Sequence, residues 1–251
     1  MDNVQPKFMA SRRREVIALG LVVFAVVRAS LSAAAIDEAN RSARVGATSV
    51  EQIISVVIQH YRTIPRMCES VTGEDRRFLG SRASVQAELR FLGPAKFFVS
   101  LTDNFAGHKE VAQFLAHDGS FTEWNLRGGL KQRDNLGLLE SALFGASVGG
   151  FGYAGSWTTA LLLSRVTGRN RIYGLHSNAQ RLADMDLDGA TMFVLKGFSP
   201  GDQVTTFWID KKTLLIKQVE VQDKSNHTLL HFARCSDDKV YVPTELPYNL
   251  K

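Results

Sequence analysis

The chain has 251 residues, of which 45% are hydrophobic, a composition typical of a globular protein rather than a disordered one. It carries 30 basic and 25 acidic residues, but residues 1–35 hold five of the basic and two of the acidic ones, so the remaining 216 residues have a net charge of only +2. We therefore expect no nucleic-acid partner, because such a partner calls for a strongly basic face.

Residues 1–35 have the organisation of a signal peptide. Three arginines at 12–14 are followed by an apolar run at 16–27, and a run of three alanines ends at Ala35. Twelve apolar residues are too few to span a bilayer, which needs about twenty. We predict export to the periplasm with cleavage near Ala35 and no stable membrane insertion afterwards. The general and the twin-arginine export routes both stay open.

Residues 36–48 are small, polar and charged, and we predict that they form a disordered lead-in to a single domain over 49–251. Two overlapping capping-box patterns follow, the second with Ser49 three residues before Gln52. Apolar residues then recur at helical spacing until a proline ends the run. This pattern predicts an amphipathic helix over 50–64.

Beyond the helix, apolar and polar residues alternate, which is the pattern of strands. Such runs, separated by turn residues, are found at 85–91, 97–102, 111–116 and 121–126. Because connections this short cannot cross over between parallel strands, we predict an antiparallel meander. Later strands are predicted at 171–175, 191–196, 204–210, 214–222 and 228–235.

The stretch 136–166 interrupts the strands. It consists of two apolar helical patterns on either side of residues 145–155, of which five are glycine. Because the glycines permit motion while Phe144, Phe151 and Trp157 supply apolar surface, we expect a mobile cover over an apolar cavity. Two rigid helices that only complete the core are one alternative, and direct contact with a membrane is another.

Two motifs suggest chemistry but lack the context that it needs. Ser147 is at the centre of a G-x-S-x-G pattern, yet the hydrolase elbow of this type joins a parallel strand to a helix. Residues 184–189 match the first half of a calcium loop, but Leu195 stands where the loop needs glutamate. The six histidines lack the spacing of a zinc site. We predict no catalytic residue, metal or cofactor; a serine hydrolase that uses Ser147 is the enzyme alternative.

Cys68 and Cys235 are the two cysteines of the chain. An oxidising compartment allows them to form a disulfide, but two distant cysteines have no diagnostic spacing. A bridge that closes so long a loop stabilises a fold by about 4–5 kcal/mol in the chain-entropy model. A disulfide and a pair of buried thiols both stay open.

Four stretches carry a family resemblance: the helix after the signal peptide, 91–99 with its Gly-Pro turn, Leu187-Asp188-Gly189 ahead of Phe193, and T-F-W-I-D-K-K-T at 206–213 with the V-E-V strand after it. Together they resemble the LolA/LolB-like superfamily of periplasmic lipoprotein carriers, and most of all an uncharacterised family of predicted periplasmic proteins within it. Of the four, the stretch 206–213 is specific as a motif.

The resemblance implies a mainly β (α+β) fold: a curved, unclosed antiparallel β-barrel with the N-terminal helix and the helical apolar insert covering its mouth. It also implies a hairpin turn at Asp188-Gly189 and an apolar cavity, which in relatives holds acyl chains. We therefore expect a non-enzymatic binding or carrier protein for a lipid or acyl chain. An envelope-sensing or regulatory module that binds an envelope protein is the alternative. The residues expected to contact the ligand are Phe97, Val99, Leu101, Phe114, Trp124 and Phe207 in the cavity wall and Phe144, Phe151 and Trp157 in the cover.

Overall fold

The structure is a computed structural model that describes residues 49–76, 82–105, 107–125, 128–145, 152–167, 179–199, 203–236 and 240–247. The chain divides into two units, Met1–Thr48 and Ser49–Lys251, and every described residue belongs to the second. The predicted signal peptide and the predicted lead-in therefore lie outside the described residues.

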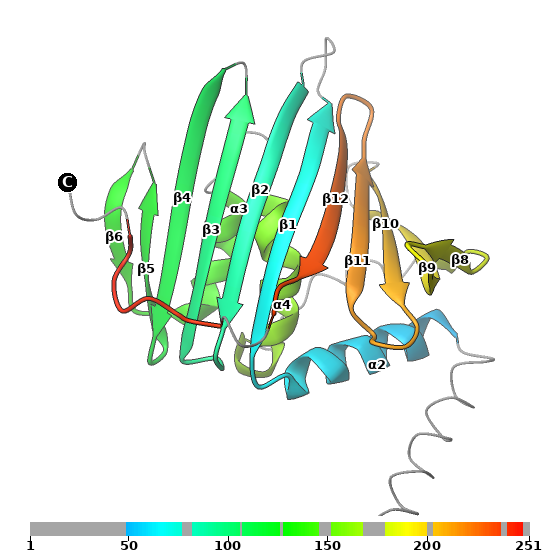
Figure 1. Ribbon diagram of the computed structural model, residues 1–251, viewed down its shortest axis with the longest axis horizontal. Coiled ribbons are helices and arrows are strands. Elements are labelled where there is room, and N and C mark those ends of the chain that lie inside the picture. Colours follow the sequence, from blue (N-terminus) through cyan, green and yellow to red (C-terminus); the bar gives the residue numbers. More distant parts are fainter. Residues whose placement is uncertain are drawn as a thin grey trace, which may run out of the picture. The chain divides into compact units, whose positions relative to one another are not determined.

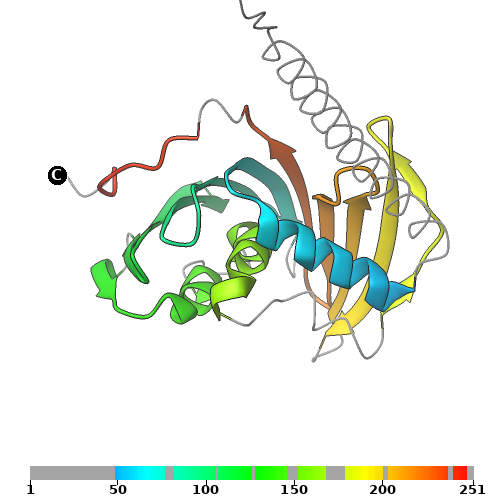
Figure 2. The same cartoon turned by 90° about the horizontal axis from the view of Figure 1, so that it is seen from below.

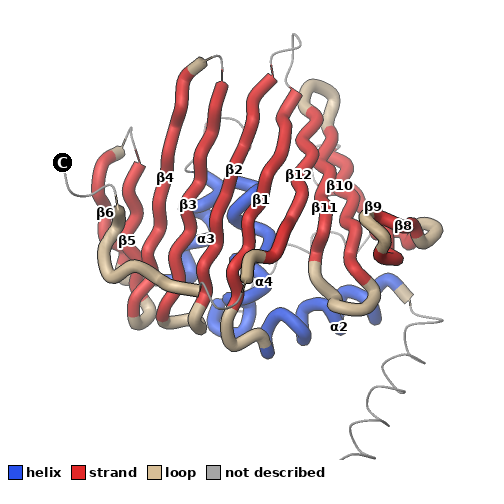
Figure 3. The backbone as a smooth tube through the Cα atoms, in the orientation of Figure 1, coloured by secondary structure: helices blue, strands red, loops and turns tan. Residues whose placement is uncertain are grey.

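Twelve strands form one antiparallel sheet (Figures 1 and 3). In chain order they are β1 (Met67–Arg76), β2 (Arg82–Phe91), β3 (Lys96–Phe105), β4 (His108–His117), β5 (Ser120–Asn125), β6 (Gly129–Arg133), β7 (Gln180–Arg181), β8 (Met185–Leu187), β9 (Ala190–Ser199), β10 (Gln203–Asp210), β11 (Ile216–Gln222) and β12 (His227–Arg234). Across the sheet they run β6-β5-β4-β3-β2-β1-β12-β11-β10-β9-β7, with β8 beside β9. The two ends of this order do not pair within the described residues, so the sheet is open, and the predicted fold class is confirmed.

Tight turns join several neighbouring strands. Asp118 and Gly119, between β4 and β5, have φ angles of 45° and 89°, and Asp188 and Gly189, between β8 and β9, have 51° and 77°. Two successive positive φ angles are the mark of the type I′ turn, which matches the twist of a hairpin. The hairpin predicted at Asp188-Gly189 is therefore confirmed. The predicted strand at 171–175 lies outside the described residues.

Helix α2 (Val50–Thr63) confirms the predicted N-terminal helix. The Ser49 hydroxyl accepts a hydrogen bond from the Gln52 amide at 3.3 Å, and the Gln52 side chain accepts one from the Ser49 amide at 2.9 Å. This capping box satisfies two backbone donors at the start of the helix. The side chains that the helix buries are Ile53, Ile54, Val57, Ile58 and Tyr61.

The insert between β6 and β7 contains the 3₁₀ helix Leu136–Leu138 and the helices α3 (Leu139–Gly145) and α4 (Gly152–Thr167). Helix α4 contacts α2, α3 and strands β1, β2 and β3. Figure 2 shows the sheet curving around α3 and α4, and we call the side that they cover the inner face. Among the described residues, no helix combines the length and the apolar character needed to cross a membrane.

The opposite side of the sheet, the outer face, is partly covered by the C-terminal segment 240–247, which is red in Figure 1. Val242 and Leu246 from this segment are buried against Phe98 of β3 and Leu115 of β4. The segment is also held by its backbone, because the Arg90 guanidinium donates a hydrogen bond to the Tyr241 carbonyl at 3.2 Å. The sheet is therefore packed on both sides over β3 and β4.

A disulfide joins Cys68 in β1 to Cys235, which directly follows β12, with the two Cα atoms 5.2 Å apart. The Cys235 amide also donates a hydrogen bond to the Cys68 carbonyl at 3.1 Å. Of the two states left open for the cysteines, the structure has the bridged one. It fixes the chain at the point where β12 ends and the C-terminal part begins.

Candidate functional site

Five of the six residues predicted for the cavity wall share the inner face. On β3 this face carries Phe97, Val99 and Leu101, and Phe114 of β4 lies directly opposite Val99 in the sheet register. Phe207 of β10 is placed there by its contact with α4: its ring lies 4.9 Å from that of Trp157 in a perpendicular arrangement. The inner face is therefore lined by apolar and aromatic side chains over both halves of the sheet.

Trp124 lies on the outer face instead. It is opposite Gln113 in the register of β4 and β5, and it packs against the outer cluster formed by Phe98, Leu115 and the C-terminal segment. The inner face of β5 carries Phe121 and Glu123. The assignment of Trp124 to the cavity wall is thus corrected, because the C-terminal segment gives this side of the sheet an apolar layer of its own.

Helix α4 fills the inner face rather than resting on its rim. Ten consecutive residues, 155–164, are buried, so the helix is covered on every side. The helix lies so close to β3 that a Cβ added at Gly155 would be 2.8 Å from Cδ2 of Leu101 and 3.2 Å from Cγ1 of Val99. Glycine at this position therefore permits the close approach of the helix to the sheet.

Of the three residues predicted for the cover, Trp157 is 6% exposed and packs on the inner face. Phe151 and the side chain of Phe144 lie outside what the structure describes. The helical insert is in the predicted place, but its second helix is an occupant of the inner face as much as a cover. The role of these residues in ligand binding stays a prediction.

A small polar group interrupts the apolar surroundings of α4. Glu69 of β1 is buried, close to Thr158 of α4 and to Tyr61 of α2. Burial raises the pKa of Glu69 to about 7; the Thr158 hydroxyl and the charges of Arg234 and Lys217 act against it. Burial also raises the pKa of Tyr61 well above its usual range, and the Glu69 charge raises it further.

Further polar atoms are buried near the helix and lack a hydrogen-bond partner among the described residues. They include Oε2 of Glu69, the hydroxyl of Thr159 on α4, and the hydroxyl of Thr205, two residues from Phe207 on β10. Ser164 of α4, in contrast, accepts a hydrogen bond from Arg62 of α2 at 3.0 Å. Since an unpaired buried hydroxyl is unfavourable, α4 fits the inner face well in shape but incompletely in polar contacts.

The residues of the calcium alternative are engaged with other side chains. Asp184 accepts hydrogen bonds from Arg181 and Lys211, and Asp186 accepts one from Thr191 at 2.9 Å. This arrangement forms the base of the β8–β9 hairpin. Among the described residues, no group of three or more His, Cys, Asp or Glu side chains is placed to hold a metal ion.

The residues of the hydrolase alternative are not assembled by the described part of the chain. Ser147 lies outside the described residues. The histidine His227 lies 2.6 Å from the Glu220 carboxylate on the outer face, and all pairs of described strands are antiparallel. The parallel strand that a nucleophile elbow requires is absent from this described sheet.

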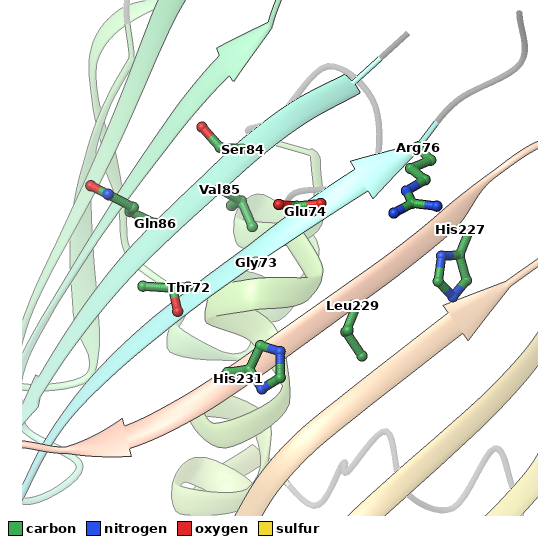
Figure 4. A pocket seen from close by; sticks show the side chains of 10 residues that line it. All are labelled: Thr72, Gly73, Glu74, Arg76, Ser84, Val85, Gln86, His227, Leu229 and His231. Carbon is green, nitrogen blue, oxygen red and sulfur yellow. The ribbon is translucent and has the colours of Figure 1, made fainter. Parts of the chain in front are cut away.

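A groove of about 510 Å³ lies over β1, β2 and β12 (Figure 4). It is lined by Thr72, Gly73, Glu74, Arg76, Ser84, Val85, Gln86, His227, Leu229 and His231. The side chains of Thr72, Glu74 and His231 stand in front of the strands, with α4 behind them, so the groove belongs to the outer face. Sequence reasoning did not find it, because alternating polar residues are what any sheet with one solvated face shows.

The chain matches no family model and no curated protein. It is similar to solved structures of LprF from Mycobacterium bovis (12% identity, 79% of this chain and 98% of that one, TM-score 0.44) and of the lipoprotein LppX from Mycobacterium tuberculosis (13%, 76% and 96%, 0.43). A LolA superfamily protein from Nitrosomonas europaea is similar at 9% identity, over 78% of this chain and 99% of that one, with a TM-score of 0.35. The printed name of this last structure is that of the superfamily that the sequence resembles.

Proposed function

We propose that the protein is a periplasmic, non-enzymatic carrier that binds a lipid or an acyl chain on the inner face of the sheet, in the place that α4 occupies. The observation that supports this most is that a whole helix covers the apolar inner face. A helix of 16 residues is about 24 Å long. An acyl chain spans one leaflet of a bilayer, about 15 Å of hydrocarbon. The space that α4 takes is therefore long enough for such a chain.

The contacts of α4 favour a displaceable helix over a permanent core element. The hydroxyl of Thr159 is buried without a hydrogen-bond partner among the described residues, which costs about 1–3 kcal/mol. This cost exists only while the helix is seated, so it lowers the free energy needed to move α4 aside. An apolar ligand gains about 25 cal/mol for each Å² of apolar surface that it buries. Exchange of α4 for a ligand then depends on two free energies of similar size, that of seating the helix and that of burying the ligand.

Locking α4 in place tests this proposal. A Cβ at Gly155 lies 3.2 Å from Cγ1 of Val99, which brings cysteines at the two positions within reach of a disulfide. We expect the oxidised double variant Gly155→Cys, Val99→Cys to lose binding of a dansyl-labelled fatty acid. Reduction is expected to restore binding to the level of the reduced single variants.

The wild type and the single variants Val99→Cys and Gly155→Cys are titrated under both conditions, because the reductant also acts on the native disulfide and a side chain at position 155 itself presses on Leu101. If the fully cross-linked variant binds the probe as tightly as its reduced form does, the ligand does not take the place of α4. Independently of this test, mass spectrometry of what co-purifies with the protein from the periplasm identifies the natural ligand class.

The periplasmic location rests on the signal-peptide pattern of residues 1–35 and on the disulfide. A disulfide persists in an oxidising compartment, which agrees with export. Cell fractionation and N-terminal sequencing of the mature protein test this part. A mature chain that begins near Ile36 is the expected result, and a full-length chain in the cytoplasm would refute it.

A further inference from the structure

A carboxyl group lies at the point where α2, α4 and β1 meet, and the carrier function makes no use of it. Glu69 of β1 is 3% exposed, and it interacts with Tyr61 of α2 and Thr158 of α4. The Tyr61 hydroxyl is itself held in place, because it accepts a hydrogen bond from the Ile216 amide at 3.0 Å. One carboxyl oxygen, Oε2 of Glu69, has no hydrogen-bond partner in the described part of the chain.

The charged neighbours of Glu69 lie on β12 and β11, which continue the sheet on one side of β1. Arg234 is opposite Glu69 in the register of β1 and β12, and Lys217 lies on β11. On the β2 side the residue opposite is the apolar Leu89. The next acidic residue on the inner face of β1 is Asp75, six positions along and therefore about 20 Å away. From α4 the group facing Glu69 is the uncharged Thr158.

We propose that the seating of α4 is linked to a proton: a neutral Glu69 holds the helix against the sheet, and an ionised Glu69 favours its release. With α4 seated, water is excluded and an ionised carboxylate is poorly solvated. With α4 released, water reaches the carboxylate and the charge is stabilised. This inference rests on the carrier function in one respect, namely that release of α4 opens the ligand site.

The direction of the pH effect follows from burial. In the seated form the pKa of Glu69 is raised to about 7, whereas the hydrated carboxyl has its ordinary value of 4.5. Release of α4 therefore gives up a proton between pH 4.5 and 7, and becomes easier as the pH rises through this range and no easier above it. Between pH 5 and 7.5 the equilibrium constant for release is expected to rise by up to about 60-fold.

Hydrogen exchange of the α4 backbone amides measures this release without any ligand. Exchange rates, corrected for the intrinsic effect of pH, are compared at pH 5 and 7.5 in the full mature protein. We expect opening of α4 to increase with pH in the wild type and to be independent of pH in Glu69→Gln. The matched control is Asp75→Asn, on the same strand and face, whose partner is the Thr228 hydroxyl at 3.0 Å; it is expected to keep the wild-type profile.

A second variant keeps the test informative if Glu69→Gln does not fold. Thr158→Val removes the hydroxyl that lowers the pKa of Glu69, so the pH at the midpoint of the opening profile is expected to rise. A wild-type profile that is flat, or one that Glu69→Gln or Thr158→Val leaves unchanged, overturns the proton linkage. If α4 opens with pH but a dansyl-labelled fatty acid never binds, the linkage stands and the carrier function fails.

Discussion

Replacing Trp157 by alanine is expected to destabilise the seated helix and to tighten the apparent binding of an acyl probe. Trp157 is 6% exposed, and its ring packs edge-on against that of Phe207 at 4.9 Å. Truncation of a buried tryptophan costs about 3–5 kcal/mol, and the ring pair contributes about 0.5–1.5 kcal/mol of this. Because the contact joins α4 to β10, the loss falls on the seated form and not on the form that the helix has left.

The change in population follows from these energies. If about 3 kcal/mol of the loss is specific to the seated form, the open form becomes on the order of 100-fold more populated, since each 1.4 kcal/mol is about a factor of ten. A ligand that binds only the open form then shows an apparent dissociation constant lowered by the same factor, as long as the open form remains the minority.

Direct titration with a dansyl-labelled fatty acid, alongside urea unfolding, measures both effects. The matched control is Trp124→Ala, which removes a tryptophan of the same size from the outer face beside the C-terminal segment. This control is expected to lower the free energy of unfolding and to leave probe affinity unchanged. A folded Trp157→Ala variant that binds the probe no more tightly than the wild type would show that α4 and the ligand do not compete for the inner face.

Three further variants test separate contacts by urea unfolding. Removing the disulfide with Cys68→Ser and Cys235→Ser is expected to lower the free energy of unfolding by up to about 5 kcal/mol; a loss below about 1 kcal/mol would contradict this. The free energy of unfolding of the wild type is expected to fall by about 3 kcal/mol as the pH rises from 4.5 to 7, because in this range Glu69 is ionised in the unfolded chain but still protonated in the native one. Glu69→Gln is expected to show no such fall. Thr159→Val is expected to add about 1–3 kcal/mol and to weaken probe binding; unchanged stability would show that the hydroxyl is solvated.

The strands show how much of the fold the alternation of apolar and polar residues predicts. Alternation groups Phe97, Val99 and Leu101 on one face of β3, and the structure has them on one face. Alternation does not say which side of the sheet that face is. The answer comes from the contact of Val99 and Leu101 with α4, which is more than fifty residues further along the chain. The same limit explains Trp124, whose apolar neighbours come from the C-terminal segment.

Strand β1 was not predicted from the sequence, although it lies at the centre of the sheet. Its inner face carries Glu69, Gly73 and Asp75, so the apolar residues that mark an inward-facing strand are missing at three positions. Neighbours from distant elements surround two of these positions: Tyr61 and Thr158 lie beside Glu69, and Thr228 donates to Asp75. A pattern that counts apolar residues cannot anticipate polar groups whose neighbours come together only in the folded chain.

The sequence predicted helix α4, but not how closely the helix packs against the sheet. Its sequence has no polar stripe of the kind that a surface helix shows, which agrees with its burial in the structure. What the sequence did not indicate is that the helix reaches the floor of the inner face. That depends on Gly155, where any larger residue would meet Leu101 and Val99.

The hydroxyl groups of α4 link its packing to the proposed exchange. Its buried residues include four that bear hydroxyls, namely Ser156, Thr158, Thr159 and Ser164. A helix with only leucine at these positions would pack against the sheet more strongly, and it would expose a larger apolar surface whenever it left. Hydroxyls reduce the apolar surface that is exposed on release, and the unpaired hydroxyl of Thr159 also weakens the seated form. A helix that must be exchanged repeatedly for an apolar ligand needs both properties, whereas a permanent core helix needs neither.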